Sequence, residues 1–263
     1  MSDIIIQSDT ATADSIEAAA KAAEHCDTLN FVSVDGKVLR LSRPIDLTGT
    51  YQDGNNADGT PRLAAKKLFV KGDGAVLYAG FPLSSVQAMV TWGAPLGMRV
   101  GGLTWRGVNV MGSVALQNVS YSRFEPEACD SVILQADSVC SYNHFCYPGC
   151  GSAVIVNQLN DSAWCDENKW YDTPLGCSGG QPVIRQVSKT ATGPVGLSFY
   201  ACTHEANGPM VELYNSAGLL WRDCYWEGAW TPGVKGKDCS VQIINCAHSP
   251  WTDPTICPCD VNE

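Results

Sequence analysis

Apolar and aromatic residues recur at a fixed interval in the second half of the chain. Between Leu197 and Cys246, steps of 22 residues bring Phe199, Trp221 and Ile243 into one column of like side chains. The same step aligns a column of cysteines, Cys202, Cys224 and Cys246. It also aligns a mostly acidic column, Glu205, Glu227 and Ser249. A degenerate repeat of this length is typical of a solenoid, because one coil cannot bury its inward side chains without its neighbours.

The same pattern extends toward the N-terminus. The aromatic column begins earlier, with Trp105, Phe124, Phe145 and Trp170, at steps of 19, 21, 25, 29, 22 and 22 residues. A second column of valines begins four apolar runs, at Val132, Val154, Val183 and Val211. Insertions at the corners of the coils account for the uneven steps. The two columns predict an all-β chain whose residues 66–250 form a single-stranded parallel β-helix.

The first 65 residues predict a different structure, an N-terminal cap. The segment from Ser15 to His25 is rich in alanine with helical apolar spacing, and Asp14 and Glu17 have the spacing of a capping box. We expect a capping helix at 15–25. The runs 29–34 and 37–41 flank an Asp-Gly turn signal and predict a hairpin-like pair of strands. Residues 251–263 interrupt the repeat and form a separate C-terminal tail.

Composition narrows the classes of partner. The chain has 263 residues and a formal net charge of −10, which disfavours binding to nucleic acid or to an anionic membrane. No run approaches 18 apolar residues, and the first residues lack the basic and apolar regions of a signal peptide. The 13 cysteines are therefore expected to be mainly buried thiols in a reducing compartment; a disulfide framework is the alternative.

Several segments resemble a known family. The entry into the repeat resembles that of the right-handed β-helix of pectate-lyase-like proteins, in its alanine-rich helix and the segment from Val38 to Leu47. The later coils resemble those of bacteriophage tailspikes, in the motifs FYACTHE (199–205) and DCYWEG (223–228). The resemblance covers roughly residues 12–250 and is one of pattern, with no catalytic signature. It implies a homotrimer in the virion, assembled in the host cytoplasm with other phage tail proteins. It also implies binding of host capsule or O-antigen polysaccharide, with cleavage by many members.

The acidic column contains the candidate catalytic residues. Endoglycosidase chemistry uses two carboxyl groups, and strands about 4.8 Å apart would bring Glu205 and Glu227 to the separation of a retaining pair. Asp223 with Glu205 offers the wider spacing of an inverting pair. Glu212 and Asp172 are further candidates. The alternative is that these acids face water at a corner of the coil and have no catalytic role.

Four aromatic residues outside the inward columns are candidates for stacking on sugars: Trp226, Trp230, Tyr225 and Trp164. Packing against a neighbouring subunit is the alternative for them. The cysteine spacings do not match a zinc site, so no metal and no cofactor is predicted. Whether the protein is an enzyme stays open: a hydrolase, a lyase or a receptor-binding module without turnover each fits the sequence.

Overall fold

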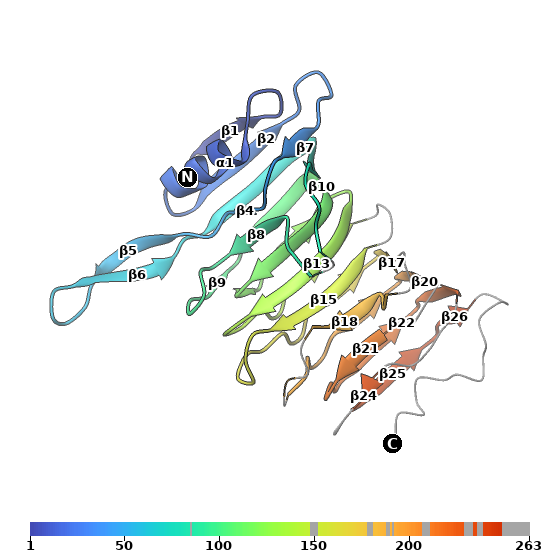
Figure 1. Cartoon of the computed structure of the whole chain (residues 1–263). Helices are drawn as coiled ribbons and strands as arrows, with labels where there is room; N and C mark the ends of the chain where they lie inside the picture. The colour runs from blue at the N-terminus through green and yellow to red at the C-terminus, as the bar shows by residue number, and fades with distance from the viewer. Residues whose placement is uncertain are drawn as a thin grey trace.

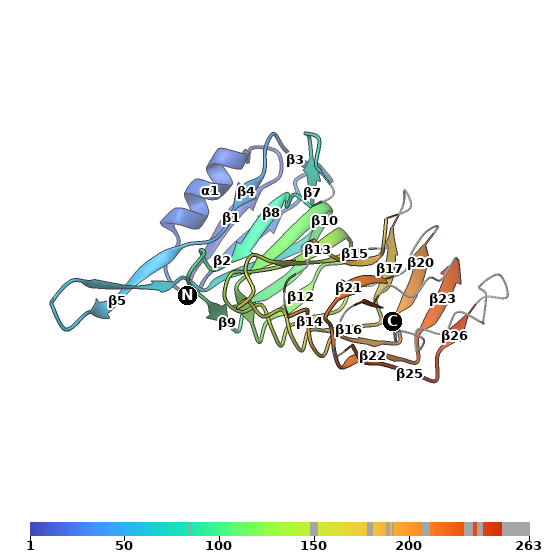
Figure 2. The same cartoon turned by 60° about the horizontal axis from the view of Figure 1, so that its bottom comes forward.

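The computed structural model of the chain describes residues 1–84, 86–147, 152–177, 181–187, 190, 192–206, 211–228, 234–235 and 239–248. Most of these residues form short strands that pair with the preceding and following turns of the chain (Figure 1). Among them, every strand pairing is parallel except that of β5 (Thr50–Asn55) with β6 (Pro61–Ala65). The protein is therefore all-β and is built on a large parallel sheet that curls on itself (Figures 1 and 2).

Three rows of strands run along the molecule, named here by their order within a coil. The first row contains β1 (Asp3–Gln7), β2 (Asp27–Val32), β7 (Leu68–Ala79), β10 (Thr104–Gln117), β12 (Arg123–Glu125), β14 (His144–Phe145), β16 (Lys169–Tyr171), β19 (Ser198–Tyr200), β22 (Leu219–Arg222) and β25 (Val241–Ile244). The middle row contains β3 (Leu39–Leu41), the later parts of β7 and β10, and then β17 (Pro174–Cys177), β20 (Thr203–Ala206), β23 (Tyr225–Gly228) and β26 (Ala247–His248).

The third row follows the middle row along the chain. It contains β4 (Ile45–Asp46), β8 (Val90–Gly93), the end of β10, β13 (Cys129–Ala136), β15 (Ala153–Gln158), β18 (Ile184–Gln186), β21 (Val211–Tyr214) and β24 (Val234–Lys235). At the corner between the third row and the next first-row strand, β9 (Val100–Gly101) pairs with β11 (Val119–Ser120). This corner later forms the candidate site.

The aromatic column predicted from the sequence is confirmed in full register. Each member pairs directly with the next one, from Trp105 through Phe124, Phe145, Trp170, Phe199 and Trp221 to Ile243. Three successive ring pairs stack with centroids 4.6, 4.9 and 5.1 Å apart, from Phe145 to Trp221. These rings are at most 1% exposed. Burial of like side chains on adjacent strands therefore fixes the register of the first row.

The valine column is right at three positions and wrong at one. Val132 pairs with Val154, but Val154 pairs with Ile184, which in turn pairs with Val211. Val183 instead accepts the backbone hydrogen bond of the Val154 amide at 2.8 Å. Both residues of the Val183–Ile184 pair are apolar and buried, so the sequence pattern could not choose between them.

The cysteine column is confirmed as a ladder of thiols. Cys202 and Cys224 are buried, Cys246 is partly buried, and all three are free. The amide of Cys224 lies 3.4 Å from the Cys246 sulfur. These cysteines act as small apolar side chains at a corner of successive coils.

The helix α1 (Ala13–Ala22) differs from the predicted 15–25 segment at both ends. Its N-cap is Thr12, whose side chain accepts from the Ser15 amide while the Ser15 hydroxyl accepts from the Thr12 amide. The predicted capping box with Glu17 is therefore wrong. Glu17 instead binds the Arg43 guanidinium at 2.6 and 2.9 Å, and this interaction lowers the pKa of the carboxyl.

The hairpin expected at residues 29–41 is also wrong. β2 and β3 do not pair with each other; both pair in parallel with different parts of β7. They are successive strands of one coil. No helix in the described part of the chain is long and apolar enough to span a membrane.

Candidate functional site

Successive coils turn into their first-row strands through a residue with positive φ. These residues lie three positions before the buried aromatic column: Gly102 (71°), Tyr121 (52°), Tyr142 (61°), Glu167 (55°), Gly196 (68°) and Gly218 (64°). Glycine adopts this conformation freely, whereas a side chain there costs roughly 1–2 kcal/mol. Three of these corners therefore carry a side chain where glycine would be less strained, as do other corners of the molecule at Asp172, Ala201 and Asp223.

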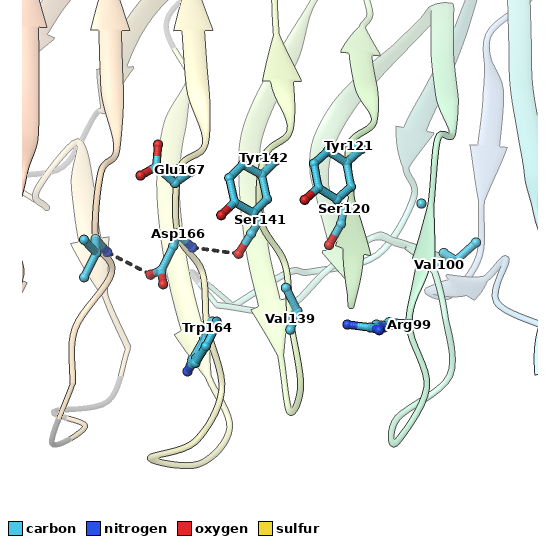
Figure 3. Close-up of a pocket in the computed structure, with 12 residues that line it drawn as sticks. Arg99, Val100, Ser120, Tyr121, Val139, Ser141, Tyr142, Trp164, Asp166 and Glu167 are labelled. Carbon is cyan, nitrogen blue, oxygen red and sulfur yellow. Dashed lines mark hydrogen bonds between the residues drawn. The ribbon is translucent and has the colours of Figure 1, made fainter.

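The three strained corners border a groove with a volume of about 590 Å³ (Figure 3). Tyr121 and Tyr142 stack face to face, with ring centroids 4.8 Å apart and planes 1° from parallel. Both are solvent-accessible, with exposed fractions of 69% and 45%. Trp164, which is 59% exposed, lies in the same groove. The groove is therefore lined by exposed aromatic side chains on three successive coils.

One ring face of Tyr121 is open. The coil before it has glycine at the neighbouring positions, Gly101 and Gly102, and Gly101 pairs with Ser120. A Cβ atom at Gly101 would lie 4.0 Å from the Tyr121 ring. Tyr121 is 69% exposed although Tyr142 covers one of its faces, so the other face is accessible from the groove. The Lys67 ammonium reaches the same corner, 3.7 Å from where a Cβ atom at Gly102 would stand. Arg99 lines the same end of the groove (Figure 3).

Two acids lie at the opposite end of the groove. The Asp166 carboxylate accepts the Val195 amide at 2.9 Å, and the Asp166 amide donates to the Ser141 hydroxyl at 3.0 Å. Burial raises the pKa of Asp166, and the neighbouring Glu167 raises it further, although the Val195 hydrogen bond opposes them. The Glu167 side chain extends over Gly196. A Cβ atom added at Gly196 would lie 2.9 Å from the carboxyl carbon of Glu167.

A ladder of buried amides holds the corners in place. Asn143 and Asn168 each follow a corner residue directly and are 0% exposed. The Asn143 amide nitrogen Nδ2 donates to the Val119 carbonyl at 2.8 Å, and the Asn168 Nδ2 donates to the Cys140 carbonyl at 2.8 Å. The Ser122 backbone donates to Asn143 Oδ1 at 3.1 Å. These bonds fix the backbone beneath the aromatic groove before any ligand binds.

The predicted carboxyl pair lies on another side of the coil. Glu205 and Glu227 pair in register on the adjacent strands β20 and β23 of the middle row, and both are exposed. Asp223 lies at the corner before β23 with φ of 56°, and accepts a 2.6 Å hydrogen bond from the Asn245 side chain. None of these three acids lines the corner groove. Asp172 is an exposed corner residue and Glu212 bonds the Tyr214 hydroxyl at 2.6 Å.

The predicted aromatic residues divide into different environments. Trp164 lines the corner groove, and Tyr225 is 39% exposed on β23, beside the acid pair. Trp226 is only 8% exposed and pairs with the buried His204, so the expectation that it points outward is wrong. It lies two residues after the inward Cys224 and therefore on the same side of the strand. Trp230 lies outside the described residues.

Sequence reasoning missed Tyr121 and Tyr142. A signal for them was available, because each lies three residues before a member of the aromatic column, at the position that Gly102, Gly196 and Gly218 occupy in other coils. Among the described residues no three His, Cys, Asp or Glu side chains gather closely enough to hold a metal ion.

The fold and the groove define a class of protein, a mainly β chain built on a large curled parallel sheet with an aromatic groove along one corner. Searches of family models, curated proteins and solved structures found no match to this chain. Any functional assignment therefore depends on the groove itself.

Proposed function

We propose that this protein binds a polysaccharide through the corner groove. The observation that carries the proposal is the exposed, stacked pair Tyr121 and Tyr142, held in strained backbone beside Trp164. Sugars present flat C–H faces to aromatic rings, and a preformed aromatic platform loses little entropy on binding. The open face of Tyr121 would stack on one sugar ring.

We infer a right-handed single-stranded parallel β-helix whose N-terminal end is capped by α1. Its support is the parallel pairing of successive coils and the buried face of the helix, where Ile16 and Ala20 join the main apolar core. Most parallel crossovers are right-handed, which favours that hand.

This fold, together with the resemblance to tailspikes, favours a biological setting. We infer a tailspike-like protein of the phage virion that binds host capsule or O-antigen, assembles as a homotrimer in the host cytoplasm and contacts other tail proteins. The alternative is a non-catalytic receptor-binding module of the phage tail, which is consistent with the same observations.

A binding experiment tests the groove. Purified protein is measured by calorimetry against capsular and O-antigen polysaccharides from a bacterial panel, with the variants Tyr121→Ala and Tyr142→Ala. An aromatic anchor at the centre of an interface is worth about 2 kcal/mol or more, so each variant is expected to lose roughly 30-fold in affinity.

The variant Tyr225→Ala is the matched control, because Tyr225 is also exposed but lies outside the groove. It is expected to bind like the parent protein. Unchanged affinity in Tyr121→Ala with reduced affinity in Tyr225→Ala would move the binding surface to the middle row. Absence of binding to every glycan would overturn the proposal.

Cleavage of the bound glycan is a second candidate function, favoured by the raised pKa of Asp166. A half-buried carboxyl with a raised pKa is better suited than an exposed one to act as a general acid on a glycosidic oxygen. Glu167 is the nearest second carboxyl of the groove. The exposed pair Glu205 and Glu227 offers the alternative site, with strands at about 4.8 Å.

New reducing ends and absorbance at 235 nm identify the chemistry. Reducing ends without absorbance would indicate a hydrolase, and absorbance would indicate a lyase. Product lost in Asp166→Asn but kept in Glu205→Gln supports cleavage in the groove. The opposite result supports the acid pair on β20 and β23, and no product with retained binding supports the non-catalytic module.

A further inference from the structure

A column of basic side chains continues the groove onto the first row of strands. Arg123, His144 and Lys169 each follow a groove corner by two residues, and they pair in register on β12, β14 and β16. The residues between them and the corners point inward: Ser122, Asn143 and Asn168 are buried. The three basic side chains are therefore the next outward residues after the groove and form one surface with it.

This column is unusual for so acidic a chain. The protein has 17 Lys and Arg against 27 Asp and Glu, yet three basic groups stand on consecutive strands about 4.8 Å apart. Like charges directly opposite one another on neighbouring strands are destabilising. The Arg123 side chain is 68% exposed, and its nearest carboxylate oxygen, on Glu125, is 3.9 Å away. The described residues therefore neutralise the column only weakly.

The surroundings of His144 show the effect of this clustering. The pKa of His144 is lowered first by partial burial and then by the charges of Lys169 and Arg123. The other groups that face it are Glu125 on β12, Cys146 after β14 and Tyr171 on β16, whose ring centroid lies 5.6 Å from the imidazole. An anion bound along the column would reverse the repulsion and favour the imidazolium form.

We propose that the column Arg123–His144–Lys169 is an anion-binding site, and that the ligand of the adjacent groove is an acidic saccharide whose carboxylates lie along it. This inference rests on the proposed function of the groove. Charge complementarity along the column supports it, although not at the Asp166 and Glu167 end of the groove, because arginine and lysine form charge-assisted hydrogen bonds with carboxylates. Arg99 adds a further basic group at the Tyr121 end of the groove, so an acidic polymer would meet cations on both sides of the tyrosine pair.

The test uses nuclear magnetic resonance to titrate His144 in the full chain, with its signal assigned by His144→Gln. The probes are an oligomannuronate, its carboxyl-reduced counterpart and inorganic phosphate, all at low ionic strength. Oligomannuronate is expected to raise the pKa of His144, and the carboxyl-reduced oligomer is expected to leave it unchanged. In the double variant Arg123→Gln/Lys169→Gln, the affinity for oligomannuronate is expected to fall about tenfold or more.

The control variant is Arg62→Gln, which removes an exposed cation on the β5–β6 hairpin; this hairpin projects from the body of the molecule (Figure 1), and Arg62 does not line the groove. It should bind oligomannuronate like the parent. No rise in the pKa of His144 with oligomannuronate would overturn the inference. An equal rise with inorganic phosphate at the same concentration would overturn the assignment to a saccharide.

The two proposals fail in different ways. If both oligomers bind equally and Tyr121→Ala abolishes both, the groove function stands and the acidic specificity is overturned. If oligomannuronate raises the pKa of His144 equally in the parent and in Tyr121→Ala, the anion site stands and the groove function fails.

Discussion

The exchange His204→Leu should make the protein more stable and less sensitive to acid. His204 lies on β20 and is 0% exposed, between the rings of Phe199 and Trp226, at centroid distances of 5.7 and 6.4 Å. Neither ring nitrogen has a hydrogen-bond partner among the described residues. The neighbouring coil has Leu175 in the same register position, also fully buried, so the column accommodates leucine.

The magnitude follows from burial. Removing a buried polar group that lacks a partner is worth about 1–3 kcal/mol at neutral pH. Burial also lowers the pKa of His204 to about 3, from its usual value of 6.5. Between these two values the unfolded chain binds one more proton than the folded chain, so stability falls as the pH falls, by at most about 1.4 kcal/mol per pH unit. Leucine removes this dependence.

Urea unfolding at pH 7 and at pH 4.5 measures both effects. The gain in unfolding free energy from His204→Leu should be larger at pH 4.5, by up to about 3 kcal/mol. The control His144→Gln changes an exposed histidine and should leave most of the acid sensitivity in place. A gain that is equal at the two pH values, or a loss of stability at pH 7, would refute the argument that His204 is buried as a neutral, unpartnered ring.

Three further predictions concern the core and the groove. Phe199→Ala should lower the unfolding free energy by about 3–5 kcal/mol in urea titrations, because it leaves a cavity between two stacked tryptophans; a loss below about 1 kcal/mol would contradict the column. Gly196→Ala should cost about 1–2 kcal/mol, since φ is 68° and the new Cβ atom would contact Glu167; an unchanged melting temperature would contradict it. Asp166→Asn should raise the unfolding free energy more at pH 8 than at pH 4. The pKa of Asp166 is raised in the folded protein, so the parent loses stability as the pH rises through that pKa, and asparagine does not. An equal effect of the substitution at both pH values would count against this burial effect.

The repeated core could be predicted from the sequence because each coil packs only against the coils before and after it. Each inward aromatic side chain packs on the equivalent residue of the next coil, so Phe199, Trp221 and Ile243 record the register directly in their spacing. Where two adjacent residues are both apolar, as at Val183 and Ile184, the spacing alone does not decide which one joins the column.

The groove was less predictable because it forms at a corner, where the backbone conformation and not the hydrophobic pattern positions the side chains. The positive φ of Tyr121 and Tyr142 has no hydrophobic signature, and tyrosine is uncommon in that conformation. The acid column was predicted in the correct register at Glu205 and Glu227, but register alone does not give a groove. Trp226 is buried, contrary to the prediction, because it lies two residues after the inward Cys224 and side chains alternate along a strand.

The N-terminal errors have a local cause. Two capping signals overlap at residues 12–17, and the hydroxyl groups of Thr12 and Ser15 form the cap while Glu17 binds Arg43. The Asp-Gly turn signal before β3 marks a corner between rows, because a parallel coil requires a turn there as a hairpin does.

A crystal structure of the protein with a bound acidic oligosaccharide tests the central claim most directly. The account predicts a sugar ring against the open face of Tyr121, with carboxylates beside Arg123 and Lys169. An oligosaccharide bound over Glu205 and Glu227, with the corner groove occupied only by solvent, would contradict it.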